Sequence, residues 1–203
     1  GCIHTNRNNT CIKNDIDILL CEDTRNTRKI LNKYEIDVKV ASYHEFNKEK
    51  VTKKFIEQME SGTNFGLVSD AGMPGISDPG FDLIKEATEK NVNVVVIPGA
   101  SAFVVALVRS NFPNDRFTYI GFLSAAKNKR KSEVDELLKS KTTTIFYDTP
   151  HKIITTLNFF KELDPKRHIF IGREMTKLNE EYITGLPHEL IFHFEEKIYF
   201  HLI

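Results

Sequence analysis

The sequence contains few cysteines and no long hydrophobic run. Three cysteines occur among 203 residues, with no Cys-x-x-Cys pair and no cluster of histidines, which argues against a disulfide framework and against a zinc site. No apolar stretch approaches the roughly 18 residues that a membrane-spanning helix needs, and residues 1–14 are polar and carry no apolar signal-peptide core. The sequence therefore predicts a cytoplasmic protein without a metal site or a membrane partner.

An excess of charge of either sign is also absent. Lys and Arg together number 28, and Asp and Glu together number 28, so the formal net charge is zero. A globally basic protein that binds nucleic acid through its overall field is excluded, and any contact with RNA must come from a local cluster of cations. The chain is long enough to bury a hydrophobic core, in one domain or in two small ones.

Apolar runs rich in β-branched residues alternate with helically spaced segments through most of the chain. This alternation predicts an α/β fold, with a mostly parallel sheet and helices on both of its faces. The polar segment 111–115 contains a proline and predicts a linker. We therefore expect an N-terminal α/β domain over residues 1–113 and a C-terminal α/β domain over residues 114–203.

The segment 69–80, Ser-Asp-Ala-Gly-Met-Pro-Gly-Ile-Ser-Asp-Pro-Gly, joins a predicted strand to a predicted helix. Most such connections are only about 2–6 residues long. Its glycines allow positive φ angles and a close approach of the backbone to a ligand, and its prolines fix the path of the loop. Since ligands of open α/β sheets bind at the carboxyl ends of strands, the loop is predicted to bind a polar small molecule.

Two further segments also follow predicted strands. Cys21-Glu22-Asp23-Thr24-Arg25 could orient a substrate, and the alternative is that Asp23 or Thr24 caps the following helix. In Pro98-Gly99-Ala100-Ser101-Ala102, Ser101 could cap a helix or present its hydroxyl to a ligand. The absence of a Gly-x-Ser-x-Gly motif argues against a serine hydrolase.

The second half of the chain contains a local cluster of cations. Lys127, Lys129, Arg130 and Lys131 occupy four of five consecutive positions. Such a run is typical of a solvated helix face, and in a neutral protein it is also the best candidate for contacts with a phosphate backbone. Segments 146–152 and 172–177 end two more predicted strands, and His151 is interpreted there as a structural or capping residue rather than a general base.

Taken in order, these segments resemble the tetrapyrrole methylase superfamily, the class III methyltransferases. Within it they are most similar to the branch that methylates small-subunit ribosomal RNA, for which Cys-Glu-Asp-Thr-Arg and the 69–80 sequence are specific. The resemblance covers about residues 15–187, and the matching segments are 21–25, 69–80, 98–102, 121–123, 146–151 and 173–177.

The resemblance implies a fold and an activity. The fold is two α/β domains, usually assembled as a homodimer. The activity is an S-adenosylmethionine-dependent 2′-O-methylation of a cytidine ribose in the decoding centre of small-subunit rRNA, with the rRNA or the small ribosomal particle as the partner. The cofactor carries the reactive methyl group, so the protein mainly has to orient the two reactants.

The resemblance also assigns candidate residues. For the cofactor these are Asp70, Ala71, Gly72, Met73, Pro74, Ser77, Asp78, Pro98, Gly99, Ser101, Ala102, Phe146 and Tyr147. The expected contacts to substrate RNA are Arg25, Lys127, Lys129, Arg130, Lys131 and Arg173. A ribose hydroxyl is a weak nucleophile, so a positioned base would help the transfer; the candidates are Glu22, Asp23, Glu174 and Lys177.

Both ends of the chain depart from the family pattern. Residues 1–14 match neither the strand nor the glycine-proline loop with which the family begins, and the part after about residue 187 is short. These departures predict a first domain without its central strand, a shortened second domain and impaired catalysis. One alternative function is therefore a catalytically impaired RNA- or cofactor-binding remnant of the same fold. A second alternative is a tetrapyrrole methyltransferase, which the 21–25 segment and the basic cluster disfavour.

Overall fold

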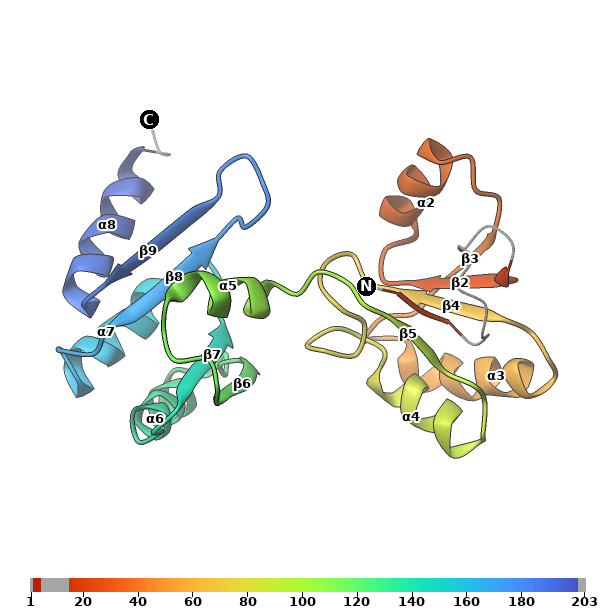
Figure 1. Ribbon diagram of the computed structural model, residues 1–203, viewed down its shortest axis with the longest axis horizontal. Coiled ribbons are helices and arrows are strands. Elements are labelled where there is room, and N and C mark those ends of the chain that lie inside the picture. Colours follow the sequence, from red (N-terminus) through yellow and green to blue (C-terminus); the bar gives the residue numbers. More distant parts are fainter. Residues whose placement is uncertain (1, 5–14, 201–203) are drawn as a thin grey trace. The chain divides into compact units, whose positions relative to one another are not determined.

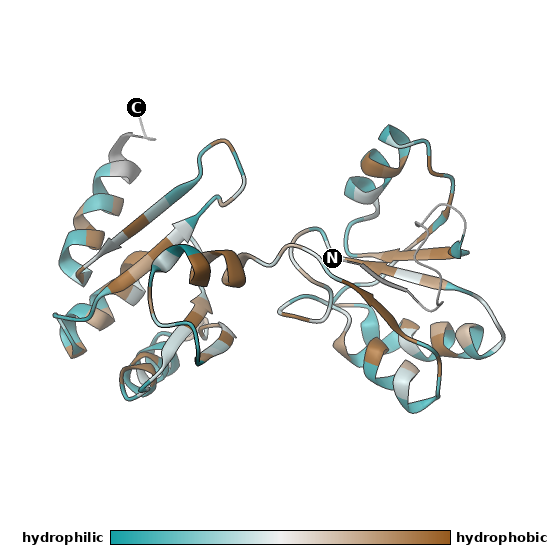
Figure 2. Cartoon of the chain, in the orientation of Figure 1, coloured by the Kyte–Doolittle hydropathy of each residue, from teal (hydrophilic) through white to brown (hydrophobic). Residues whose placement is uncertain are grey.

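A computed structural model of the protein describes residues 2–4 and 15–200, and the side chains of residues 15–196 (Figure 1). The chain divides into two compact units, Gly1–Ser101 and Ala102–Ile203. The sequence predicts a boundary at 113/114, whereas the structure includes helix α5 (Ala102–Ser110) in the second unit. The reason is that α5 is hydrophobic along most of its length (Figure 2) and packs against strands β7, β8 and β9 of that unit.

The first unit contains a five-stranded sheet in the order β3-β2-β4-β1-β5. Its strands are β1 (Cys2–His4), β2 (Ile18–Cys21), β3 (Lys39–Ser42), β4 (Phe65–Val68) and β5 (Val95–Ile97). Strand β2 runs parallel to β3 and to β4, and all four of its residues are buried. A strand covered on both faces needs such a continuous apolar run, so the predicted α/β class is confirmed.

Strand β1 occupies the position between β4 and β5. It runs antiparallel to both neighbours, with Cys2 opposite Val68 on one side and Ile97 on the other. The sequence predicts that this unit lacks its central strand, whereas in the structure residues 2–4 fill the gap. The direction of β1 makes the sheet mixed rather than wholly parallel.

Helices α2 (Thr24–Lys33), α3 (Lys48–Glu60) and α4 (Phe81–Glu89) cover the two faces of this sheet, α3 and α4 on one face and α2 on the other (Figure 1). Helix α3 carries Phe55 and Met59 four residues apart, and both are buried in the core. They pack with Phe65 and Leu67 of β4 and with Leu83 of α4. The core therefore lies between the sheet and the α3–α4 layer.

The second unit is built on two separate pairs of strands. Strands β6 (Phe117–Phe122) and β7 (Thr143–Tyr147) are parallel, and β8 (Ile169–Arg173) and β9 (Glu181–Gly185) are antiparallel. Besides α5, its helices are α6 (Lys127–Leu138), α7 (Ile153–Leu163) and α8 (Pro187–Phe200). Two apolar clusters form its core. One joins α6 to α7, and the other joins α7 to α8.

Two features bear on the absences noted in the sequence. No helix among residues 2–4 and 15–200 is long and apolar enough to cross a membrane. In the same part of the chain, no three His, Cys, Asp or Glu side chains gather as they would around a metal ion. Cys21 is a buried free thiol whose pKa is raised by its burial, and Cys11 lies outside the described residues.

Candidate functional site

The loop between β4 and α4 is the long connection 69–80 that the sequence singles out. Gly72, Gly75 and Gly80 have φ angles of +74°, +81° and +141°, and Ser77 has a φ angle of +57°. The amide of Gly75 donates a hydrogen bond to the carbonyl of Pro79 at 3.3 Å, so the loop is folded back on itself. A loop with four residues in the left-handed half of φ space has a defined shape rather than a random path.

Gly80 is where the loop has least room. A β-carbon on this residue would lie 2.8 Å from Cδ2 of Leu67 and 3.1 Å from the backbone nitrogen of Gly75. Two other loop residues anchor the turn from inside, because Met73 packs against the core of the first unit and Pro74 is buried. Ala71, by contrast, is exposed. The backbone and the polar side chains are therefore the parts of the loop available to a ligand.

The 69–80 loop and the 21–25 segment come together at one edge of the sheet. They follow β4 and β2, which are adjacent and parallel with Cys21 opposite Val68. The side-chain amide of Asn26 donates a hydrogen bond to Oδ2 of Asp70 at 3.0 Å, which joins the loop to the first turn of α2. Two motifs that the sequence places after separate strands therefore lie together at the carboxyl ends of β2 and β4, the edge at which ligands of open α/β sheets bind.

This edge of the sheet carries a group of carboxylates. Burial of Asp78 and the nearby negative charge of Glu22 raise the pKa of Asp78, and a hydrogen bond from Ser69 opposes that shift. The charge of Asp70 adds to the same rise. Such an acidic edge attracts a ligand that carries positive charge or donates hydrogen bonds.

Asp23 acts as the N-cap of α2. Its Oδ1 accepts a hydrogen bond from the backbone amide of Arg25 at 2.8 Å, and its Oδ2 lies 2.8 Å from the Arg25 guanidinium. The side-chain and backbone hydrogen bonds from Arg25 lower the pKa of Asp23 to about 2. The capping interpretation is confirmed for Asp23, and a carboxylate of such low basicity is a poor general base. Arg25 keeps an exposed guanidinium although it pairs with Asp23.

The segment after β5 is open to solvent. Pro98 and Gly99 are exposed, and Ser101 and Ala102 are half-buried. Ser101 is the last residue of the first unit, and Ala102 is the first residue of helix α5 in the second.

An aromatic cluster stands at the carboxyl ends of β6 and β7 in the second unit. Phe103 stacks on Tyr119 with ring centroids 4.2 Å apart. The ring centroids of Tyr119 and Phe122 lie 5.4 and 5.2 Å, respectively, from the ring centroid of Tyr147. The Tyr147 hydroxyl accepts a hydrogen bond from the backbone amide of Phe103 at 3.3 Å. Ala102 and Tyr147, two residues predicted to bind the cofactor, are thereby brought close together.

The side chain of Phe146 lies on the opposite face of strand β7 from that of Tyr147. Neighbouring residues of a strand point to opposite faces, and the Phe146 ring stacks against Phe160 within the α6–α7 core. The Phe146 side chain therefore packs in the α6–α7 core, whereas the Tyr147 ring packs in the aromatic cluster with Tyr119 and Phe122. An open groove of about 1760 Å³ is lined by α5, α7, β7 and β8, and both Phe146 and Tyr147 contribute to it. That volume exceeds what a single small ligand fills, so the groove is not a fitted ligand pocket.

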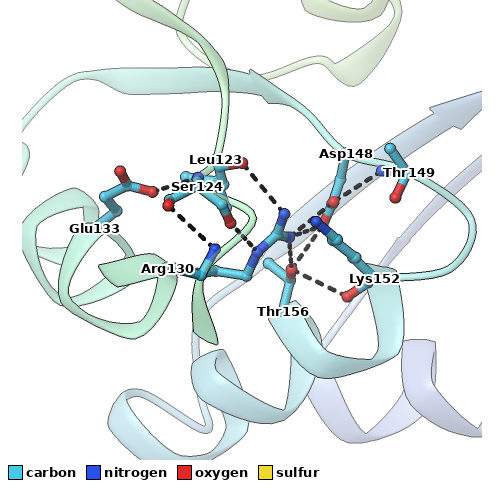
Figure 3. A network of polar contacts seen from close by, with 9 residues as sticks. Leu123, Ser124, Arg130, Glu133, Asp148, Thr149, Lys152 and Thr156 are labelled. Carbon is cyan, nitrogen blue, oxygen red and sulfur yellow. Dashed lines mark hydrogen bonds and ion pairs between the residues drawn. The ribbon is translucent and has the colours of Figure 1, made fainter. Parts of the chain in front are cut away.

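The predicted role of Arg130 as an RNA contact is wrong. The sequence predicts that it contacts RNA, but its side chain is only 3% exposed and lies between β6, β7 and α7 (Figure 3). Its Nη1 lies 2.8 Å from both carboxylate oxygens of Asp148 and 2.6 Å from the hydroxyl of Thr156. Its Nε and Nη2 donate to the carbonyls of Ser124 and Leu123. All of these donors are used inside the protein, so Arg130 is unavailable to a phosphate.

The other predicted contacts of the second unit lie near the surface. Lys127 and Lys129 are exposed in the first turn of α6, and Lys131 pairs with Glu162. Nε of Arg173 lies 3.5 Å from Oε2 of Glu181, so these two side chains form an ion pair. The catalytic candidates Glu174 and Lys177 pair with each other at 3.2 Å.

Sequence patterns missed several residues of these sites. Asn26 carried no signal beyond its position beside the 21–25 motif. Phe122 lies within the matched segment 121–123, but the sequence assigned no role to it. Asp148 directly follows the end of β7 at Tyr147, and this position at a strand end was a signal that could have identified it. Thr156 lies in helix α7 and carried no such signal. Arg130 itself shares a helical face with Val134, which is fully buried.

The fold is that of a class of methyltransferases. One solved structure, a cobalt-precorrin-4 methyltransferase of cobalamin biosynthesis, matches 91% of this chain and 80% of its own with a TM-score of 0.64 at 11% identity. A uroporphyrin-III C-methyltransferase from Thermus thermophilus, complexed with S-adenosyl homocysteine, matches 90% of this chain and 81% of its own with a TM-score of 0.57 at 12% identity. At such identities the likeness concerns the fold alone.

The sequence assigns the family. Residues 12–191 match the tetrapyrrole (corrin/porphyrin) methylases, and the chain belongs to this family.

Curated relatives give a narrower likeness. The ribosomal RNA small subunit methyltransferases I of Halalkalibacterium halodurans and Bacillus subtilis are 42% and 43% identical to the chain, each over 87% of it. The protein of the same name from Thermotoga maritima is 39% identical over 90% of the chain and 82% of its own length. The chain spans about 60% of the length of the first two relatives.

Proposed function

We propose that the protein transfers a methyl group from S-adenosylmethionine to the 2′-hydroxyl of a cytidine ribose in the decoding centre of small-subunit rRNA. The observation that supports this most strongly is the 42% identity, over 87% of the chain, to a protein named as a small-subunit rRNA methyltransferase. The proposal includes the homodimer that is usual in the family.

The edge formed by 21–25 and 69–80 has groups that suit the cofactor. S-adenosylmethionine carries an ammonium and a sulfonium charge, and the carboxylates of Asp70 and Asp78 offer negative charge and acceptors for the ammonium and the ribose diol. The glycines with positive φ angles leave the loop backbone accessible to the cofactor's own carboxylate. When bound, the cofactor supplies the electrophilic methyl group.

The protein's own part in the reaction is to orient the reactants and to remove a proton. Methyl transfer by in-line displacement needs the ribose oxygen behind the methyl carbon, opposite the sulfur, so positioning accounts for much of the rate. Of the four candidate bases, Asp23 is the least suitable because of its low pKa. Glu22 is exposed at the acidic edge beside Asp78, and we propose it as the first base to test.

The first test is methylation itself. Tritium from labelled S-adenosylmethionine is expected to appear in unmethylated small ribosomal subunits, and alkaline hydrolysis is expected to leave a resistant dinucleotide, the signature of a 2′-O-methyl group. Glu22→Gln is expected to lower kcat by about 10²-fold or more because a general base contributes about 10²–10⁴-fold. A folded sample that binds the cofactor but transfers no tritium would favour the non-catalytic remnant. Label on a base would contradict the ribose assignment.

The second test concerns the cofactor. Asp70→Asn keeps an oxygen that can accept from Asn26 but removes the charge, and we expect the Kd for S-adenosylmethionine to rise about tenfold, since a hydrogen bond to a charged group is worth about 1.5–3 kcal/mol. Isothermal titration calorimetry measures the change without any need for turnover. Asp37→Asn is the matched control, because Asp37 is exposed just before the amino end of β3. Equal effects of the two substitutions would contradict the assignment of Asp70.

A further inference from the structure

Strand β6 contains an irregularity that changes the direction of a side chain. In a regular strand, residues three positions apart point to opposite faces. Tyr119 and Phe122 are three apart, yet the rings of both lie against Tyr147. The pairing of β6 with β7 shifts register between these two residues, and Gly121 has a φ angle of +70°. The bulge therefore turns Phe122 onto the face that carries Tyr119.

The bulge also leaves Phe122 partly open to solvent. The residue is 56% exposed, although its ring rests against that of Tyr147 at a centroid distance of 5.2 Å and an interplanar angle of 53°. Tyr147 is itself held by the amide of Phe103 and by the ring of Tyr119. Phe122 is thus an exposed aromatic ring on a rigid support, and bulges next to functional sites commonly re-aim a side chain in this way.

The residues that follow Phe122 indicate what could bind to it. Helix α6 begins at Lys127, and Lys127 and Lys129 in its first turn are exposed. These lysines follow Phe122 by five and seven positions in the chain. Proteins hold single-stranded nucleic acid with exposed aromatic rings and cations together: bases stack on the rings and phosphates pair with the cations.

We propose that Phe122 is a stacking platform for a nucleobase of the RNA substrate. The inference rests on the proposed function, because it assumes that RNA reaches this end of β6. The adenine of the cofactor is a second source of the same chemistry. RNA is favoured because the exposed lysines that follow Phe122 in the chain suit a phosphate backbone, whereas the cofactor bears net positive charge.

The experiment measures binding without turnover. Phe122→Leu removes the ring and keeps an apolar side chain, and Phe122→Trp keeps a larger ring. Phe117→Leu is the matched control, because Phe117 is 44% exposed at the other end of the same strand. The Kd for unmethylated small ribosomal subunits is measured by filter binding, and the Kd for S-adenosylmethionine by calorimetry. Circular dichroism and thermal unfolding establish that each variant is folded.

Phe122→Leu is expected to weaken binding of the ribosomal subunit about tenfold, the order of one lost base–aromatic stack. Phe122→Trp and Phe117→Leu are expected to remain within about twofold of the unchanged protein, and the cofactor Kd is expected to stay constant. Weaker cofactor binding alone would overturn the RNA assignment in favour of adenine, and unchanged binding of both would overturn the platform altogether. If the unchanged protein binds subunits without methylating them, the proposed activity fails while the stacking platform is still tested.

Discussion

Replacing Arg130 with methionine is expected to lower the free energy of unfolding of the second unit by about 3–5 kcal/mol, the usual loss when one partner of a buried ion pair is removed. The carboxylate of Asp148 is only 6% exposed, and without Arg130 it would keep only the amide of Thr149 and the hydroxyl of Thr156 as close donors among the described residues. The carbonyls of Leu123 and Ser124 would lose a donor as well.

Denaturant unfolding followed by circular dichroism measures this loss. Lys131→Met is the control, because Lys131 is the next residue of the same helix and its ion pair with Glu162 is largely exposed, so a change of at most about 1 kcal/mol is expected. Thr156 gives an independent comparison. Thr156→Ser keeps the hydroxyl and Thr156→Val keeps the shape, so a larger loss for valine points to the polar network. An effect of Arg130→Met no larger than that of Lys131→Met would contradict the importance of the ion pair.

Gly80→Ala is expected to destabilise the first unit by about 3 kcal/mol and to weaken cofactor binding. A φ angle of +141° is strained for any residue with a β-carbon, at a cost of about 1–3 kcal/mol. The added carbon would also lie 2.8 Å from Leu67 and 3.1 Å from Gly75, and overpacking costs a further ~1–3 kcal/mol. The turn must shift to relieve this contact, and the loop that carries Asp70 and Asp78 must shift with it.

The control for Gly80 is Gly62, at the end of helix α3. Its φ angle is +96°, and a β-carbon there would meet no atom within 4 Å. Gly62→Ala therefore introduces backbone strain without a clash, at the opposite end of strand β4 from the loop. We expect Gly62→Ala to lower the midpoint of unfolding but to leave the Kd for S-adenosylmethionine unchanged, as measured by calorimetry. An unchanged Kd for folded Gly80→Ala would contradict the role assigned to the loop shape.

The sequence predicted much of the first unit because its signals are local. The apolar spacing of Phe55 and Met59 identifies the buried face of α3, and the glycines and prolines of 69–80 identify an ordered loop. Asp23 is placed before a helix and does cap it. Each of these features depends on residues within a few positions of one another, and such features can be read from one segment.

Tertiary contacts decide the features that the sequence did not predict. Four of the five residues in the run 127–131 are basic, yet Arg130 faces inward, because it shares a helical face with Val134 and because Asp148, directly after strand β7, completes the ion pair. The pairing of β1 joins residues 2–4 to segments more than sixty positions away in the chain. The re-aimed ring of Phe122 depends on a register shift against β7, which no pattern within β6 contains.

The buried pair of Arg130 and Asp148 also limits how this protein can change over generations. Replacing both residues with well-packed apolar ones can be nearly neutral, whereas replacing either one leaves a buried charge without its partner. The route from a charged pair to an apolar pair therefore passes through a less fit intermediate, unless both codons change nearly together. The effect of a substitution at position 130 therefore depends on the residue at position 148, and the two positions are expected to change together.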